Sequence, residues 1–158
     1  SSLTQRYLPG SSNWMGPYKR GPWYVTSCDF ICMISKEHFA ELVLPELREE
    51  LAYLGGNTIF HLDGPGALRH LDALLELPDL TGVQWVYGAG QPSARHWLDV
   101  LHRIQDAGKL VNVALKREDV VPVLSALRPE GLSCSFDFAV TEGEAGEILD
   151  LAQRLSRR

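Results

Sequence analysis

The feature that most constrains the fold is a repeated alternation between short apolar runs and longer segments with helical spacing. The alternation occurs five times after residue 22. Strands that alternate with helices through short connections predict a parallel sheet with helices packed outside it. The predicted strands are Tyr24–Ile34, Thr58–Leu62, Gly82–Tyr87, Leu110–Leu115 and Leu132–Val140.

Each predicted strand is followed by a predicted helix. The first helix begins after Ser35 and ends at Gly55-Gly56, and Pro45 should kink it because proline lacks the N–H donor. The remaining helices are predicted over about 66–76, 93–107, 118–127 and 141–157. Thr141 and Glu144 have the spacing of a capping box that opens the last one.

Right-handed crossovers allow two architectures for such a chain, an open doubly wound sheet or part of a (β/α)8 barrel. Five units are too few to close an eight-stranded barrel. We therefore expect an α/β fold, a partial TIM-type barrel of about five parallel β/α units, over residues 23–158. Residues 1–22 are rich in Gly, Pro, Ser and aromatic residues and are expected to form an irregular aromatic arm.

Composition excludes several classes of function. The net charge of -5 is spread along the chain, whereas nucleic-acid binding would require a basic stripe. No apolar run approaches the roughly 20 residues that span a bilayer. Three cysteines without a framework spacing favour a reducing, cytoplasmic compartment. Because the sequence begins with Ser1-Ser2 rather than Met, we expect a processed product or a domain of a longer protein.

Ligands of both architectures bind beyond the carboxyl ends of the strands, which directs attention to His61 and Asp63. They lie two residues apart at the end of a predicted strand and so share one face. His61 offers an acid–base group or a nitrogen ligand, and Asp63 offers an anionic oxygen. The Gly64-Pro65-Gly66 turn that follows would admit a close backbone approach. The alternative is that His61 is a core or rim histidine whose hydrogen bonds are satisfied within the fold, and that Asp63 caps a helix.

Other strand ends supply further candidates. Gln84, Trp85 and Tyr87 are candidates for substrate binding, and Trp85 and Tyr87 share a face that would wall a pocket or simply pack. Asp29 falls within an apolar predicted strand, where a buried carboxylate needs a partner.

Two basic residues and one cysteine complete the set. Lys116 and Arg117 follow a predicted strand and would pair with a substrate carboxylate unless they are solvated loop charges. Cys134 is either a core residue or, if it meets His61 from a nearby strand, a ligand of zinc.

Several blocks in this order resemble the uroporphyrinogen decarboxylase superfamily. Phe30–Pro45 resembles the segment in which a Ser-Pro-x-x-Phe helix runs into a Leu-Pro. His61-Leu62-Asp63-Gly64 and then Gly82-Val83-Gln84-Trp85 follow in the order of that superfamily's C-terminal half. The resemblance covers about residues 23–156 and implies the C-terminal half of a (β/α)8 barrel.

The resemblance implies two activities. One branch decarboxylates the acetate arms of a tetrapyrrole without a cofactor. The other transfers methyl groups between corrinoid proteins and thiols such as coenzyme M, and binds zinc through a His-x-Cys at the position of His61. Here Asp63 replaces that cysteine, so the implied zinc ligands are His61, Asp63 and Cys134. The decarboxylases take essential arginines and an aspartate from an N-terminal half that this sequence does not match.

Three functions follow from these observations. The first is a methyltransferase-type enzyme acting on a small thiol or a corrinoid-linked methyl group, with a corrinoid protein as partner. The second is a decarboxylase acting on a tetrapyrrole or another carboxylate, with Asp29, Lys116 or Arg117 acting on the carboxylate. Asp29, His61 and Asp63 are the catalytic candidates overall. The third is a non-catalytic barrel fragment or module that self-associates as a homodimer through its unpaired sheet edges.

Overall fold

The computed structural model describes residues 10–16, 18–21 and 23–155, and its centre is one parallel sheet of five strands. The strands follow one another across the sheet in chain order and are all parallel. They are β3 (Tyr24–Ser27), β4 (Thr58–Asp63), β5 (Gly82–Val86), β6 (Leu110–Leu115) and β7 (Leu132–Phe136). The predicted parallel α/β architecture is thus confirmed, and β3 and β7 form the two edges of this sheet.

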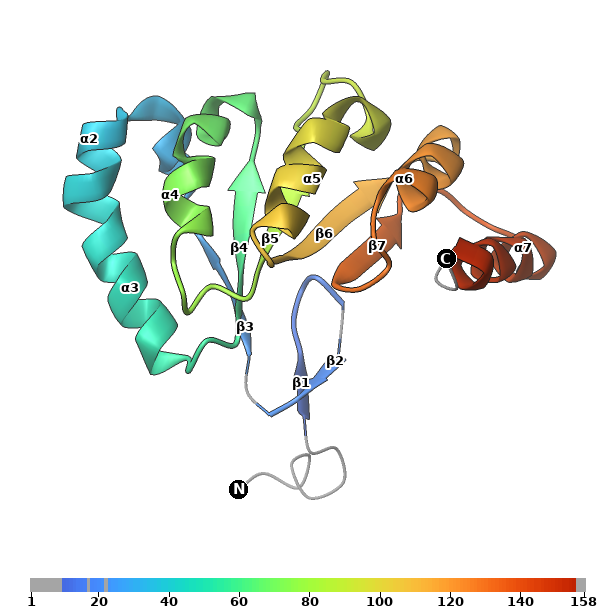
Figure 1. Cartoon of the computed structure of the whole chain (residues 1–158), viewed down its shortest axis with the longest axis horizontal. Helices are drawn as coiled ribbons and strands as arrows, with labels where there is room; N and C mark the ends of the chain where they lie inside the picture. The colour runs from blue at the N-terminus through green and yellow to red at the C-terminus, as the bar shows by residue number, and fades with distance from the viewer. Residues whose placement is uncertain (1–9, 17, 22, 156–158) are drawn as a thin grey trace.

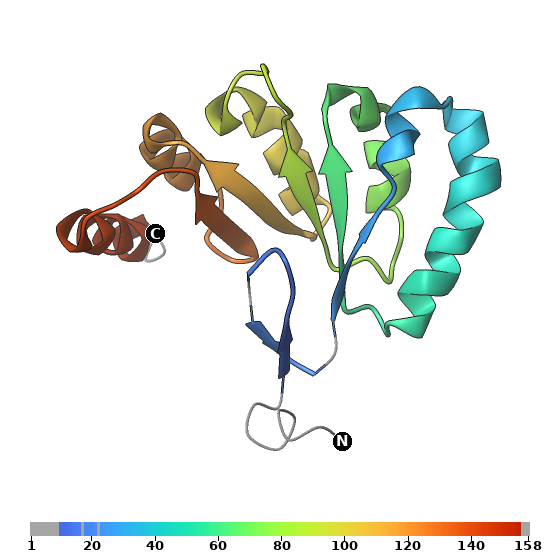
Figure 2. The same ribbon diagram turned by 180° about the vertical axis from the view of Figure 1, so that it is seen from behind.

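The connecting segments lie along one face of the sheet, as Figures 1 and 2 show from opposite sides. A sequential strand order with right-handed crossovers requires this, because every connection then returns on the same side. The helices are α2 (Lys36–His38), α3 (Leu44–Tyr53), α4 (Leu71–Leu75), α5 (Leu98–Asp106), α6 (Val120–Ala126) and α7 (Glu142–Leu155). The other helical segments are the 3-10 helices η1 (Asp29–Met33), η3 (Pro65–His70), η4 (Ala94–Trp97) and η5 (Arg117–Asp119), and the π-helix η2 (Phe39–Val43).

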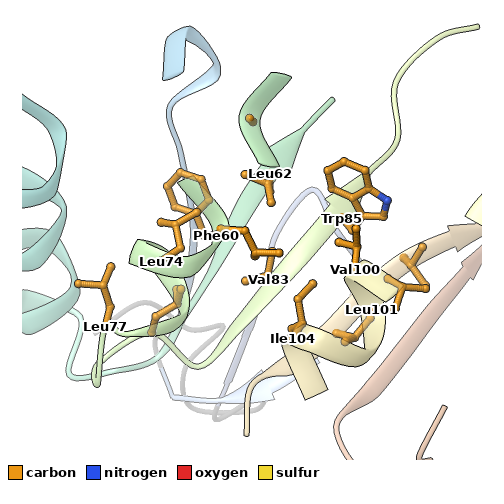
Figure 3. Close-up of a cluster of buried hydrophobic side chains, with 14 of the residues drawn as sticks. Phe60, Leu62, Leu74, Leu77, Val83, Trp85, Val100, Leu101 and Ile104 are labelled. Carbon is orange, nitrogen blue, oxygen red and sulfur yellow. The ribbon is translucent and has the colours of Figure 1, made fainter. Parts of the chain in front are cut away.

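The main core lies between the sheet and these helices. Phe60 and Leu62 of β4 and Val83 and Trp85 of β5 point toward α4 and α5, as Figure 3 shows. These side chains are almost completely buried. We call this side of the sheet the helix face. The alternation of side chains along each strand sends the intervening residues, such as His61 and Gln84, to the opposite side.

The opposite side is partly covered by an antiparallel hairpin, so we call it the hairpin face (Figure 2). The hairpin consists of β1 (Gly10–Ser12) and β2 (Tyr18–Arg20). Met15 and Trp23 pack there against Val25, Ile59 and Leu110, in a small second core. The expectation of an irregular backbone is therefore wrong for this part, because β1 and β2 pair as a hairpin, and its aromatic and apolar residues pack against the sheet. The rest of the arm, residues 1–9, lies outside the described residues.

Two predicted strands are shorter than expected. The strand predicted over Tyr24–Ile34 leaves the sheet after Ser27, and Asp29–Met33 form η1 instead. Only Ile31 of this apolar run is buried, because η1 packs its single inner position against η3. The strand predicted over Leu132–Val140 ends at Phe136, after which Asp137 N–H donates to the Leu115 carbonyl and the chain turns away.

The predicted helices are present, with local departures that have physical causes. Pro45 cannot donate a hydrogen bond, and the π-helix η2 lies directly before it, so the segment is divided as expected. The capping box of α7 is confirmed: Glu144 N–H donates to Thr141 Oγ1 at 3.3 Å, and Thr141 N–H donates to Glu144 Oε2 at 2.8 Å. Residues 156–157, predicted to end this helix, lie outside the described part.

One prediction arises from the packing of η1 against η3. His70 is buried, stacks on Phe39 with ring centroids 4.4 Å apart, and donates from Nε2 to the Ile31 carbonyl at 2.9 Å. Burial lowers the pKa of His70 below its usual 6.5, so the folded chain binds this proton less readily than the unfolded chain. The free energy of unfolding should therefore fall as the pH drops below 6.5, by up to about 1.4 kcal/mol per pH unit.

Urea unfolding between pH 7.5 and 5.5 measures this dependence. His70→Leu should flatten the slope, whereas His102→Gln, which changes an exposed helical histidine, should retain it. An unchanged slope in His70→Leu would show that another group carries the pH dependence.

Candidate functional site

The site is built around His61, which lies near the carboxyl end of β4 on the hairpin face. Gln84 of β5 stands directly opposite in the strand register, and its Oε1 accepts from His61 Nδ1 at 2.6 Å. This bond places the imidazole hydrogen on Nδ1. The lone pair of the neutral ring therefore lies on Nε2, which is the atom able to accept or deliver a proton.

His61 and Gln84 belong to a row of polar residues that crosses the whole sheet. The strand register pairs Ser27 with His61, Gln84 with Asn112, and Asn112 with Ser133. Asn112 Nδ2 donates to Ser133 Oγ at 3.1 Å. We call Ser27, His61, Gln84, Asn112 and Ser133 the polar row. It spans roughly 19 Å at the usual strand spacing of about 4.8 Å.

The polar row contrasts with the packing on either side of it. The helix face of the same strands is apolar, and toward the amino ends of the strands the hairpin face carries the apolar cluster of Trp23, Val25 and Ile59. Polar groups on a sheet are retained at little cost only where they bond to one another, to water or to a ligand. A row of hydroxyl, amide and imidazole groups at one level therefore offers several hydrogen-bonding partners to a polar small molecule.

Asp63 extends the site beyond the strand. It lies two residues after His61 on the same face and is exposed. Gly64 follows with a φ of 77°, a conformation that favours glycine, and its N–H donates to the Val86 carbonyl at 2.8 Å. The structure thus brings His61, Asp63 and Gln84 together at the carboxyl edge, as the sequence predicts for two neighbouring strands.

The Gly64-Pro65-Gly66 turn serves the packing of two loops. A Cβ added to Gly66 would lie 3.3 Å from Cys32 Cβ and 3.4 Å from the Cys32 carbonyl oxygen. The close backbone approach expected for a ligand is therefore made to η1, the turn that follows β3. This contact fixes the turn after β4 beside the turn after β3.

Three candidates occupy other positions than expected. Trp85 is completely buried on the helix face, where it packs edge-to-face on Trp97 at 5.2 Å, so the substrate-binding role predicted for it is wrong. Tyr87 is partly buried against the same core, where burial raises the pKa of its phenol. Asp29 is exposed in η1 rather than buried in a strand, because the chain leaves the sheet before it.

The two basic candidates have different surroundings. Arg117 donates to Glu144 Oε1 at 2.6 Å and lies 4.7 Å above the Phe138 ring, so it ties the end of β6 to α7. Lys116 is exposed at the carboxyl end of β6, and its extended backbone continues the alternation that places Asn112 and Ala114 on the hairpin face. By this alternation Lys116 lies on the hairpin face, the same side of the sheet as His61.

Cys134 is not brought to His61. It pairs in register with Val113 on the helix face, whereas His61 lies on the hairpin face. Cys134 lines an apolar cavity of about 370 Å³ between β7, α6 and α7, and burial there raises the pKa of its thiol to about 11. Zinc binds the thiolate form. The zinc ligands implied by the resemblance therefore do not fit, and no group of three His, Cys, Asp or Glu residues within the described residues is placed to hold a metal.

The raised pKa gives a second prediction. At pH 8 Cys134 should hold about a hundredfold less thiolate than a thiol with the usual pKa of 9.0. Its reaction with a disulfide reagent should be correspondingly slow, because the thiolate is the attacking species. Cys134→Ala should remove one slow phase of thiol release, measured by absorbance, and leave the phases of Cys28 and Cys32. A fast phase lost in Cys134→Ala would show that the thiol is exposed and ionised.

Sequence reasoning missed Ser27, Asn112 and Ser133. A signal was present for Asn112, since a lone amide interrupts the apolar strand Leu-Val-Asn-Val-Ala-Leu. Serines at the other two positions carry no such contrast. Their alignment with His61 depends on strand register, which is a property of the assembled sheet.

Comparisons of the chain with protein-family models, with curated proteins and with solved structures found no match. In the part of the chain that the structure describes, no helix is both long and apolar enough to cross a membrane.

Proposed function

We propose that this chain forms part of the active site of a β/α-barrel enzyme of the uroporphyrinogen decarboxylase type, acting on a small carboxylate. The observation that carries the proposal is the hydrogen bond between His61 Nδ1 and Gln84 Oε1, at the centre of the polar row. The sequential parallel strand order with helices along one face supports the proposal, because it is compatible with a segment of a β/α barrel. The polar row would then face the barrel interior.

The proposed reaction is a decarboxylation in which His61 supplies a proton. The carbon–carbon bond to the carboxylate breaks, CO2 leaves, and the electron pair remains on the carbon. The Nε2–H of protonated His61 transfers its proton to that carbon. Water then restores the proton to the imidazole, and the hydroxide left behind combines with the CO2 as bicarbonate. Lys116 at the end of β6 would hold a second carboxylate of the substrate.

Gln84 acts in this scheme as a positioning residue. Its carbonyl oxygen accepts from Nδ1 in both protonation states of His61, so the ring keeps its orientation through the proton transfer. Asp63, two residues further along the same face, lies where it would accept hydrogen bonds from a hydroxyl or amine of the substrate.

Methyl transfer to a thiol takes second place among the candidate functions. In that branch of the family zinc activates the thiol, and the ligand set His61, Asp63 and Cys134 is divided between the two faces of the sheet. The cofactor-independent reaction needs no metal, and the hairpin face supplies a proton donor in His61.

The test is CO2 release from a panel of carboxylates that includes a tetrapyrrole, with methyl transfer from a methylated thiol assayed in parallel. We expect His61→Gln to lower the rate by roughly 100- to 10,000-fold, the usual contribution of acid–base catalysis. Gln84→Leu should give a smaller loss and a displaced pH profile. His102→Gln, at an exposed helical histidine, is the matched control and should be neutral.

Each contrary result has a definite meaning. Full activity in His61→Gln would remove the assigned role of His61. Methyl transfer without CO2 release would replace the decarboxylase by a methyltransferase. If no substrate is turned over and none shifts the His61 NMR signals, the chain is a non-catalytic or self-associating module and the proposal fails.

A further inference from the structure

Trp14 lies directly against the site. Its indole contacts the imidazole of His61 with ring centroids 5.3 Å apart and ring planes at 78°. Trp14 belongs to the turn between β1 and β2, the hairpin that lies over this face of the sheet (Figure 2). The contact therefore joins two segments separated by more than forty residues in the sequence.

The exposure of Trp14 shows that its ring does not close off the site from solvent. A ring that sealed the site would itself be buried, whereas 61% of Trp14 is exposed to solvent. An edge-to-face contact with His61 uses only part of the indole surface. The exposed part of the side chain is thus available for contact with a second ring.

Hydrogen bonds and packing fix the backbone of the turn on both sides of Trp14. Asn13 Oδ1 accepts from Met15 N–H at 3.0 Å, and the Asn13 carbonyl accepts from Gly16 N–H at 2.9 Å. Met15 packs into the cluster around Trp23, and Trp23 Nε1 donates to the Ser11 carbonyl at 2.9 Å. Because the turn is already ordered, little conformational entropy of the turn would be lost when a ligand stacks on Trp14.

We infer that Trp14 is a stacking platform that selects substrates with a planar, unsaturated ring. This inference deepens the proposed function, since it places the ligand on the polar row. The amides and hydroxyls of that row are uncharged, and they would bond to polar substituents at the edge of the ring while its face rests on Trp14. His61 then lies at the border between the ring and its carboxylate.

The test compares two probes of equal charge and similar size, benzoate and cyclohexanecarboxylate. The chain is labelled with 5-fluorotryptophan, and Trp14→Phe identifies the Trp14 line among the four tryptophans. We expect benzoate to shift the Trp14 line and to bind roughly two- to tenfold more tightly than cyclohexanecarboxylate. Trp14→Ala should reduce this ratio to about one, and Trp14→Phe should largely keep it.

Tyr53→Ala is the matched control, because Tyr53 is 90% exposed at the end of α3. It should leave the ratio unchanged. Equal affinities for the two probes, binding that shifts other tryptophans but not Trp14, or no binding of benzoate would overturn the inference. The comparison of probes on the unaltered chain remains decisive even if Trp14→Ala folds poorly.

The outcomes separate this inference from the proposed function. If His61→Gln abolishes turnover while the probes bind equally, the proposed function stands and the role of Trp14 fails. If benzoate is preferred through Trp14 but no carboxylate is turned over, the ring-binding site stands and the proposed reaction fails.

Discussion

Replacement of Asp119 by alanine is expected to lower the free energy of unfolding by about 3 kcal/mol or more. Asp119 is completely buried and joins two loops at the carboxyl edge of the sheet. Its Oδ1 accepts from Ser93 Oγ at 2.6 Å and from Arg95 N–H at 3.1 Å, and its Oδ2 accepts from Lys116 N–H at 2.9 Å. Alanine would leave all three donors without their acceptor.

The same carboxylate gives a pH dependence of known sign. Burial by itself would raise the pKa of Asp119, but the hydrogen bonds from Ser93, Lys116 and Arg95 outweigh it and hold the pKa below the usual 3.8. The folded state therefore favours the ionised form. The stabilisation is complete above pH 3.8 and is lost as the pH falls through the lower, folded-state pKa.

Urea unfolding at pH 7 and at pH 3 measures both effects. Asp119→Asn should lose most of the stabilisation, because its amide nitrogen cannot accept a hydrogen bond. Glu118→Gln, at the exposed neighbouring position, should change the free energy of unfolding by less than about 0.5 kcal/mol. If Asp119→Ala were as stable as the unaltered chain, the two loops would be held together by other contacts.

The second large effect is expected at Trp85. It is completely buried between the sheet and the helices, as Figure 3 shows, and alanine would leave a cavity that its neighbours cannot fill. Such replacements cost about 3–5 kcal/mol. Trp85→Phe should cost less than half as much, because the Trp85 Nε1 donor is buried without a partner and its removal breaks no hydrogen bond.

Thermal and urea unfolding measure the change, and ligand titration separates packing from binding. Trp85→Phe should keep the affinity for benzoate, because Trp85 lies on the opposite side of the sheet from the polar row. A selective loss of affinity in this variant, with stability retained, would return Trp85 to the site. Tyr53→Ala again serves as the exposed aromatic control.

The sequence does not predict which face of each strand packs against the helices. Period-two alternation correctly separates Gln84 from Trp85 and His61 from Leu62, because it is a local property of an extended chain. It does not say which set faces the helices. A pocket wall and a packed side chain therefore both fit the sequence position of Trp85, and its complete burial on the helix face decides for packing.

Cys134 illustrates the same limit between distant segments. Its sequence position allows either a place in the core or a meeting with His61 at the carboxyl edge, and the family resemblance implies the second. The register places Cys134 beside Val113 and Ser133 beside Asn112. A shift of one residue would have reversed their faces, and no short stretch of sequence encodes that choice.

The sequence by itself determined the five parallel β/α units, the ends of most helices, and the position of His61 and Asp63 at a strand end. These follow from local periodicity, capping and proline or glycine chemistry, which act within a single segment. Only the tertiary structure decided the alignment of the polar row, the separation of Cys134 from His61, and the contact between Trp14 and His61. These depend on pairing and packing between segments far apart in the chain, where burial and register select among faces that are locally equivalent.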